Sequence, residues 1–171
     1  TRAASAESSA ASFCQESNTI VADVFQDATH RVKAVFDDLW LHFAAPQAWQ
    51  LYSDVEDCLA QLRSQKIHVA IASNFDARLT SVCQGHDNLR DLKIYCSSEL
   101  GFAKPHANFF RAIEGELGLS PHQLVMVGDD RNADYIGAQS AGWMSVHLVR
   151  DRGSQDETIS TLRELPALLA R

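Results

Sequence analysis

The amino-acid sequence predicts an α/β protein with an open, mostly parallel sheet of the Rossmann-like type. Short apolar runs suited to buried parallel strands alternate with amphipathic helical patterns through the second half of the chain. Polar and charged residues follow directly after these runs, at the positions where ligands bind in open α/β sheets. Apolar residues make up 46% of the 171 positions, which is enough to form a substantial core.

The N-terminal quarter of the chain is predicted to be largely helical. Residues 1–18 are rich in Ala and Ser and carry no periodic pattern. In residues 20–43 the apolar side chains recur at intervals of three and four, which predicts helix with an interruption near residues 27–29. Pro46 ends this region, and a second helix is predicted to begin with Asp54 as its N-cap.

The core is predicted to follow as alternating strands and helices. Residues 67–72 form the first apolar run, which predicts a strand, and residues 77–83 form the helix after it. The remaining strands are expected at residues 93–97, 124–127 and 144–149. The remaining helices are expected at residues 107–117 (closed by Gly118), 132–141 (capped by Gly142) and 158–169.

Charge and composition argue against several classes of partner. The chain has 15 Lys+Arg and 22 Asp+Glu, a net charge of −7, whereas nucleic-acid binding requires a clustered basic surface. No apolar run approaches the roughly 20 residues of a membrane helix. The four cysteines form no CxxC pair, and the polar opening residues do not resemble a signal peptide. We therefore expect a reduced cytoplasmic protein with neither a nucleic-acid nor a membrane partner.

The residues that follow the predicted strands favour a site for a phosphoryl group and a divalent metal ion. Ser73 and Asn74 follow the first strand, Lys104 lies in the loop after the second, and Asp129 and Asp134 follow the third. The carboxyl ends of parallel strands meet at one edge of a sheet, so these groups are expected to converge. A hydroxyl, an ammonium group and carboxylates together suit a phosphate bound with Mg²⁺.

Three segments resemble motifs of the haloacid dehalogenase-like (HAD) hydrolase superfamily. They are IHVAIASN at residues 67–74, GFAKPHANFF at 101–110 and VGDDRNADYIGAQSAG at 127–142. The stretch FAAPQAWQLYSDVEDCLAQLR, followed by SNFDARL, is similar to the subgroup named HAD-like hydrolase domain-containing proteins. A small helical cap precedes the second motif in that subgroup. The resemblance implies that residues 1–48 are an N-terminal segment with part of the cap, and that residues 49–171 are the HAD-like core.

The resemblance also implies a role for each matching residue. Ser73 would donate a hydrogen bond to a phosphoryl oxygen, and Asn74 would support its loop. Lys104 would neutralise the phosphate and the neighbouring carboxylates. Asp129 would be a ligand of Mg²⁺, and Asp134 would hold a metal-bound water or orient Lys104. One departure is His106-Ala107, where relatives usually have Asp-Pro.

The first motif of the superfamily, which carries the aspartate nucleophile, has no clear counterpart in this sequence. Asp23 and Asp37 are the two nearest matches, but both lie within the helical pattern and are better explained as solvated helix positions. The missing motif implies a missing central strand, between the strands that end at Ser73 and Asp129. We therefore expect that the nucleophile and its strand belong to a missing N-terminal segment; the alternative is that another segment or a second copy of the chain fills this place.

The resulting expectation is a Mg²⁺-dependent phosphatase that hydrolyses a small phosphorylated metabolite through a phosphoaspartate. This chain alone would be inactive without its nucleophile. The alternative is a non-catalytic HAD-like module that binds phosphate or another protein. A metal-independent dehalogenase is less consistent with the sequence, since Gly128-Asp129-Asp130 would place acidic charge without a balancing cation. An incomplete cap would expose apolar surface and favour a homo-oligomer.

Overall fold

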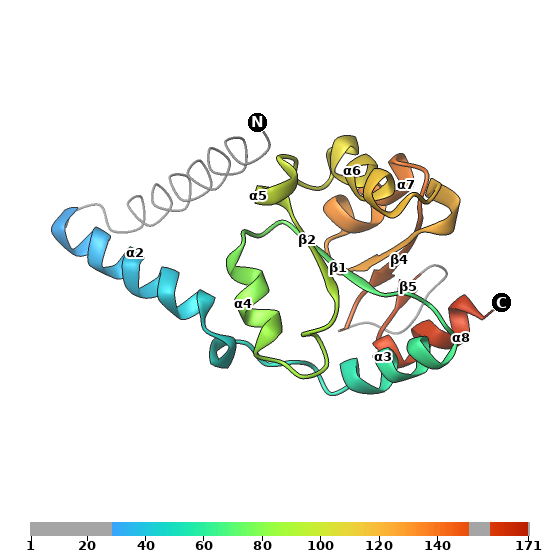
Figure 1. Cartoon of the computed structure of the whole chain (residues 1–171), viewed down its shortest axis with the longest axis horizontal. Coiled ribbons are helices and arrows are strands. Elements are labelled where there is room, and N and C mark those ends of the chain that lie inside the picture. Colours follow the sequence, from blue (N-terminus) through green and yellow to red (C-terminus); the bar gives the residue numbers. More distant parts are fainter. Residues whose placement is uncertain (1–28, 151–157, 171) are drawn as a thin grey trace. The chain divides into compact units, whose positions relative to one another are not determined.

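The computed structural model describes residues 29–150 and 158–170 (Figure 1). These residues form two compact units, each built from two stretches of chain. The first unit contains the described residues up to Gln50 together with Ala72–Gly101. The second contains Leu51–Ile71 and the described residues from Phe102 onward. The predicted division between residues 48 and 49 stays a prediction.

The first unit contains most of the predicted N-terminal helix. Helix α2 (Thr29–Ala44) packs against α4 (Arg78–Gln84), and the predicted residues 20–28 lie outside the described part. Its other elements are the short helix η1 (Pro46–Ala48), strand β2 (Lys93–Cys96) and α5 (Ser97–Leu100). The buried apolar side chains of this unit are Phe36, Val82, Cys83, Tyr95 and Cys96.

The second unit is built on a parallel sheet of three described strands. In spatial order these are β3 (Val125–Gly128), β4 (Met144–Leu148) and β5 (Thr158–Ile159). The helices of this unit are α3 (Val55–Ser64), α6 (Ala107–Leu117), η2 (Pro121–Gln123), the π-helical turn η3 (Arg131–Ile136), α7 (Gly137–Ser140), η4 (Leu162–Glu164) and α8 (Leu165–Leu169).

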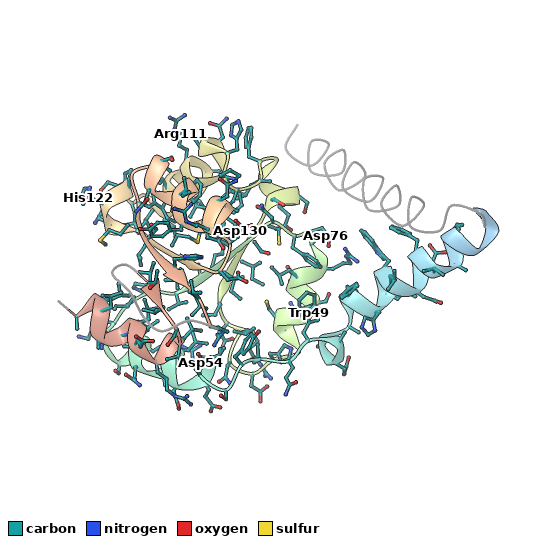
Figure 2. All side chains as sticks on the ribbon, turned by 180° about the vertical axis from the view of Figure 1, so that it is seen from behind. Trp49, Asp54, Asp76, Arg111, His122 and Asp130 are labelled. Carbon is teal, nitrogen blue, oxygen red and sulfur yellow. The ribbon has the colours of Figure 1, made fainter. Side chains whose placement is uncertain are left out.

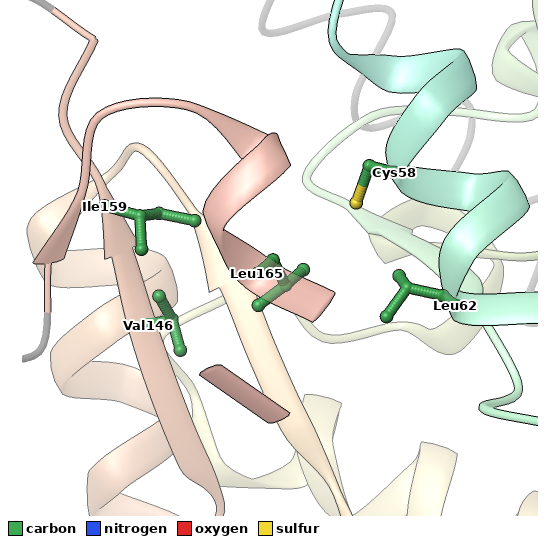
Figure 3. Close-up of a cluster of buried hydrophobic side chains, with 5 residues drawn as sticks. All are labelled: Cys58, Leu62, Val146, Ile159 and Leu165. Atoms are coloured by element: carbon green, nitrogen blue, oxygen red, sulfur yellow. The ribbon is translucent and has the colours of Figure 1, made fainter. Parts of the chain in front are cut away.

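One face of this sheet packs against α3 and α8. Figure 3 shows Cys58 and Leu62 of α3 directed toward Leu165 of α8, with Val146 and Ile159 on the neighbouring strands. Val125 and Val127 of β3 pack against the same cluster. Because side chains alternate along a strand, buried Met126 between them faces the opposite side, where α6 and α7 lie (Figure 1). The sheet is therefore covered by helices on both faces, as parallel sheets require.

The predicted α/β fold class is confirmed, but the described strands form two sheets. Strand β1 (Ala70–Ser73) pairs with β2, whereas β3, β4 and β5 form the other sheet. Among the described strands, β3 pairs only with β4 and is therefore an edge strand of its sheet. The strand that the sequence predicts to be missing between β1 and β3 is not among those described. None of the helices in the described part is long and apolar enough to cross a membrane.

One local prediction is wrong, and another is confirmed only in part. The C-terminal helix does not begin at Thr158, because Thr158–Ile159 forms β5 beside β4. Thr161 and Glu164 then form a capping box, and α8 follows with Pro166 in its first turn. Asp54 does occupy the N-cap position of α3, as predicted. Its side chain makes no capping hydrogen bond to the helix, because other groups of the second unit engage its carboxylate.

Candidate active site

A buried ion pair between Lys104 and Asp134 is the centre of the candidate site in the second unit. Lys104 lies in the loop before α6, and its Nζ is 2.6 Å from Asp134 Oδ1. The two side chains are only 8% and 9% exposed. The Lys104 ammonium group also lies 5.8 Å from the centre of the Phe109 ring. Burial in a weakly screened environment makes this pair far more consequential than a surface salt bridge.

The hydrogen bonds of Asp134 show which of its two predicted roles the structure favours. Its Oδ1 accepts from Lys104, and its Oδ2 accepts from the backbone N–H of Asp130 at 3.2 Å. Both oxygens therefore have protein donors, which hold the carboxylate in one orientation. This arrangement suits a residue that orients Lys104 better than one that holds a metal-bound water.

Gly128, the last residue of β3, leaves room for the Asp134 carboxyl group. A Cβ atom at this position would overlap that carboxyl group and also approach the Asp134 Cβ. The backbone of β3 and the acidic side chain can therefore meet only because residue 128 has no side chain.

We expect Gly128→Ala to destabilise the protein by about 1–3 kcal/mol, because the added methyl group must displace the Asp134 carboxylate from Lys104. Urea unfolding measures this change. Gly115→Ala is the matched control: Gly115 lies in α6, its Cβ would meet nothing within 4 Å, and alanine should stabilise the helix by about 0.5–1 kcal/mol. Equal effects of the two substitutions would contradict this account of Gly128.

Asp129 and Asp130 differ sharply although they are adjacent. Asp130 Oδ1 accepts from the backbone N–H groups of Asn132 and Ala133 at 2.8 Å each, and so caps the π-helical turn (Figure 2 labels Asp130). The hydrogen bond from the Ala133 N–H, followed by that from the Asn132 N–H, lowers the pKa of Asp130. The Asp129 carboxylate is exposed and makes no hydrogen bond or ion pair with the described residues. Asp129 is therefore the carboxylate of this strand end that is available to a ligand.

Ser73 and Asn74 belong to the first unit. Ser73 ends β1 and is partly buried, and Asn74 begins the following loop and is exposed. The loop backbone is anchored at the next residue, because the Phe75 carbonyl oxygen accepts from Ser97 Oγ at 3.2 Å and from the Ser98 N–H at 3.4 Å. The structure thus brings Lys104 and Asp134 together directly, while the convergence of Ser73 and Asn74 with them stays a prediction.

A model of one protein family matches residues 6–142 of the chain, which is most of its length. Its description is a haloacid dehalogenase-like hydrolase. The chain belongs to this family. The resemblance that the three sequence motifs indicated is thereby confirmed.

Individual HAD-like relatives extend this result. The human haloacid dehalogenase-like hydrolase domain-containing protein 3 is 29% identical over 154 residues, which are 84% of this chain and 61% of that protein. Enolase-phosphatase E1 of Pectobacterium atrosepticum is 30% identical over 105 residues, covering 59% of this chain and 45% of that enzyme. A HAD phosphatase from Thermococcus onnurineus has a similar fold, with a TM-score of 0.68 and 24% identity over 82% of this chain and 70% of that one. This chain spans less than two thirds of the length of the human relative.

Sequence reasoning missed two interactions that involve neighbours of the predicted site residues. Arg78 and buried Asp76 form a bidentate ion pair just after the Ser73 loop, with Nη2 to Oδ2 at 2.8 Å. The Arg78 guanidinium group lies over the Trp40 ring at 3.5 Å and donates to the Trp40 carbonyl oxygen, which attaches α2 to this loop. The tripeptide DAR within SNFDARL contains both members of this pair, but Trp40, on which Arg78 stacks, lies 38 residues earlier and leaves no signal in the local sequence.

The second missed interaction is that of His147 on β4, whose Nε2 lies 3.1 Å from the Asp129 carbonyl oxygen.

Proposed function

We propose that this chain is the larger part of a Mg²⁺-dependent phosphatase that acts on a small phosphorylated metabolite. The observation that carries the proposal is the contrast among the acidic groups after β3. Asp134 is buried against Lys104, Asp130 is used as a cap, and Asp129 has no partner among the described residues. The name of a relative, enolase-phosphatase, supports phosphate-ester chemistry.

The residues present fit a magnesium ion, with Asp129 as its ligand. The described residues contain no group of three His, Cys, Asp or Glu side chains that could enclose a metal ion. Mg²⁺ does not require such an enclosure, since it is commonly held by one or two carboxylates together with water and substrate phosphate. When bound, the ion would supply positive charge that stabilises the phosphoryl group during transfer.

The other residues would bind and orient the phosphate. Lys104, held by Asp134, would present its ammonium protons to the phosphoryl oxygens as a fixed point charge. Ser73 would donate its hydroxyl proton to another phosphoryl oxygen, and Asn74 would support that loop. Preorganised charge of this kind is the main protein contribution to phosphoryl transfer.

We propose further that the nucleophilic aspartate lies in a segment that precedes this sequence. Asp23 lies outside the described residues. Asp37 lies on the exposed surface of α2, where it accepts from Lys33 one turn earlier at 2.6 Å, so it is better explained as a solvated helix position. In the described part, β1 and β3 are both edge strands and so can each accept a further strand. The greater length of the relatives is consistent with such a segment.

We expect the full-length protein to release phosphate from small phosphomonoesters such as p-nitrophenyl phosphate only when Mg²⁺ is present. Asp129→Asn should lower this rate by about 100-fold or more, because the neutral amide is a poor ligand for a hard cation. Phosphate release with and without EDTA measures the effect. Asp130→Asn is the matched control and should retain most activity, since asparagine is an equally good cap.

The non-catalytic alternative predicts a different outcome of the same experiment. A phosphate-binding module would release no phosphate from any ester, yet would bind inorganic phosphate in a manner that depends on Lys104. Full activity of Asp129→Asn would instead contradict the assignment of Asp129 as the Mg²⁺ ligand, and with it the observation on which the phosphatase proposal rests.

A further inference from the structure

His147 lies at the end of β4 beside the proposed metal ligand. The register of the parallel pair sets His147 opposite Gly128, the residue just before Asp129. Its Nε2 is 3.1 Å from the carbonyl oxygen of Asp129. A carbonyl oxygen can only accept a hydrogen bond, so the proton of this contact belongs to Nε2 and His147 is the donor.

The His147 ring is held from a second side. Its centre is 5.8 Å from that of the Tyr135 ring, which comes from the π-helical turn η3, and the two planes are tilted by 35°. The side chain is partly buried. The ring thus has a defined place between η3 and the chain that leaves β3.

The Asp129 side chain has no such support of its own. Its carboxylate makes no hydrogen bond with the described residues, so its direction depends on the backbone that carries it. The His147 hydrogen bond holds that backbone at the peptide that follows the Asp129 side chain. Since Asp130 N–H is held by Asp134, the same peptide group is fixed at both of its polar atoms.

We propose that His147 is a positioning residue that fixes the Asp129 peptide and so presents the Asp129 carboxylate to a divalent cation. The inference rests on the proposed function, because it takes Asp129 as the metal ligand. It assigns His147 no contact with substrate or metal. Partners that orient a metal ligand typically change metal affinity by about 10–100-fold when they are removed.

The test is the Mg²⁺ affinity of the full-length protein without substrate, measured by titration calorimetry. His147→Leu removes the donor and should weaken Mg²⁺ binding by about tenfold. His147→Gln keeps an N–H donor of similar reach and should stay within about threefold of the wild type. The matched control is His122→Leu, which changes an exposed histidine of η2 (labelled in Figure 2). It should leave the Mg²⁺ affinity unchanged.

Three outcomes separate this inference from the proposed function. If His147→Leu and His147→Gln weaken binding equally, or neither does, while Asp129→Asn abolishes it, the role of His147 is refuted and the metal site stands. If the wild type does not bind Mg²⁺, or binds it no better than Asp129→Asn, both proposals fail. We expect the urea midpoints of both His147 variants to lie close to that of the wild type. A large fall of the midpoint in His147→Gln as well as in His147→Leu would assign the residue to folding and not to metal binding.

Discussion

Asp134→Asn is expected to destabilise the protein by about 3–5 kcal/mol and to abolish phosphate release. The substitution keeps an oxygen for the Asp130 N–H but removes the charge that balances Lys104. Because the Lys104 side chain is only 8% exposed, its ammonium group would remain buried after losing the carboxylate charge that lies 2.6 Å away. Urea unfolding of the full-length variant measures the loss of stability, and phosphate release under saturating Mg²⁺ measures the loss of function.

A second substitution separates the structural from the functional contribution of this pair. Lys104→Met in the Asp134→Asn background removes both charges of the pair, so that no buried charge is left uncompensated. The double variant should therefore regain most of the unfolding free energy but none of the activity. If the double variant is instead destabilised by the sum of the losses caused by Asp134→Asn alone and by Lys104→Met alone, burial of an uncompensated charge is not the cause of the destabilisation.

The fold was predictable from the sequence wherever a short pattern decides the structure. Strand β3 is a continuous apolar run that ends in Gly128, and α6 has a regular apolar face and ends at Gly118, which adopts φ 66°. The β5 segment could not be predicted in this way, because two residues carry no periodicity. Thr158 and Ile159 form a strand only because β4 offers them a partner edge.

The candidate site was predictable in residue type and order, but only partly in geometry. The sequence places Lys104 and Asp134 after successive strands, and the structure joins them at 2.6 Å. The sequence could not show that the Asp130 side chain would cap η3 while the carboxylate of its neighbour Asp129 stays without a partner among the described residues. That difference depends on the backbone path at the start of η3. His147 was equally hidden, because its contact with Asp129 is created by the pairing of β3 with β4.

Asp54, which the sequence suggested as a helix cap, has a larger role in the second unit. Its carboxylate accepts from Arg150 Nη1 at 2.8 Å and Nη2 at 3.2 Å, from Thr161 Oγ1 at 2.7 Å and from the Leu162 N–H at 2.9 Å. The Asp54 side chain is 4% exposed (Figure 2 labels it). One carboxylate thus connects the start of α3 to the end of β4 and to the turn before α8.

We expect Asp54→Ala to destabilise the protein by about 3–5 kcal/mol, since it leaves several donors without their acceptor. The matched control is Asp57→Ala on the same helix. Asp57 pairs with Arg163 at 3.3 Å, but both side chains are more than half exposed. That loss should be at most about 1 kcal/mol. Urea unfolding at pH 7 compares the two variants, and similar losses would show that burial is not what distinguishes the pairs.

The difference between the wild type and Asp54→Ala should also depend on pH in a defined direction. The Arg150 guanidinium group, followed by the Thr161 hydroxyl and the Leu162 amide, holds the pKa of Asp54 far below its usual value, although burial opposes this. In the unfolded chain the group titrates near its ordinary value of about 3.9. The ionised carboxylate therefore stabilises the fold fully above about pH 4, and this contribution falls as the pH drops below that value toward the folded pKa. Urea unfolding at pH 7, 5 and 3 should show a constant difference between the first two and a smaller one at the third, whereas a difference that stays the same at pH 3 would assign the effect to packing instead of charge.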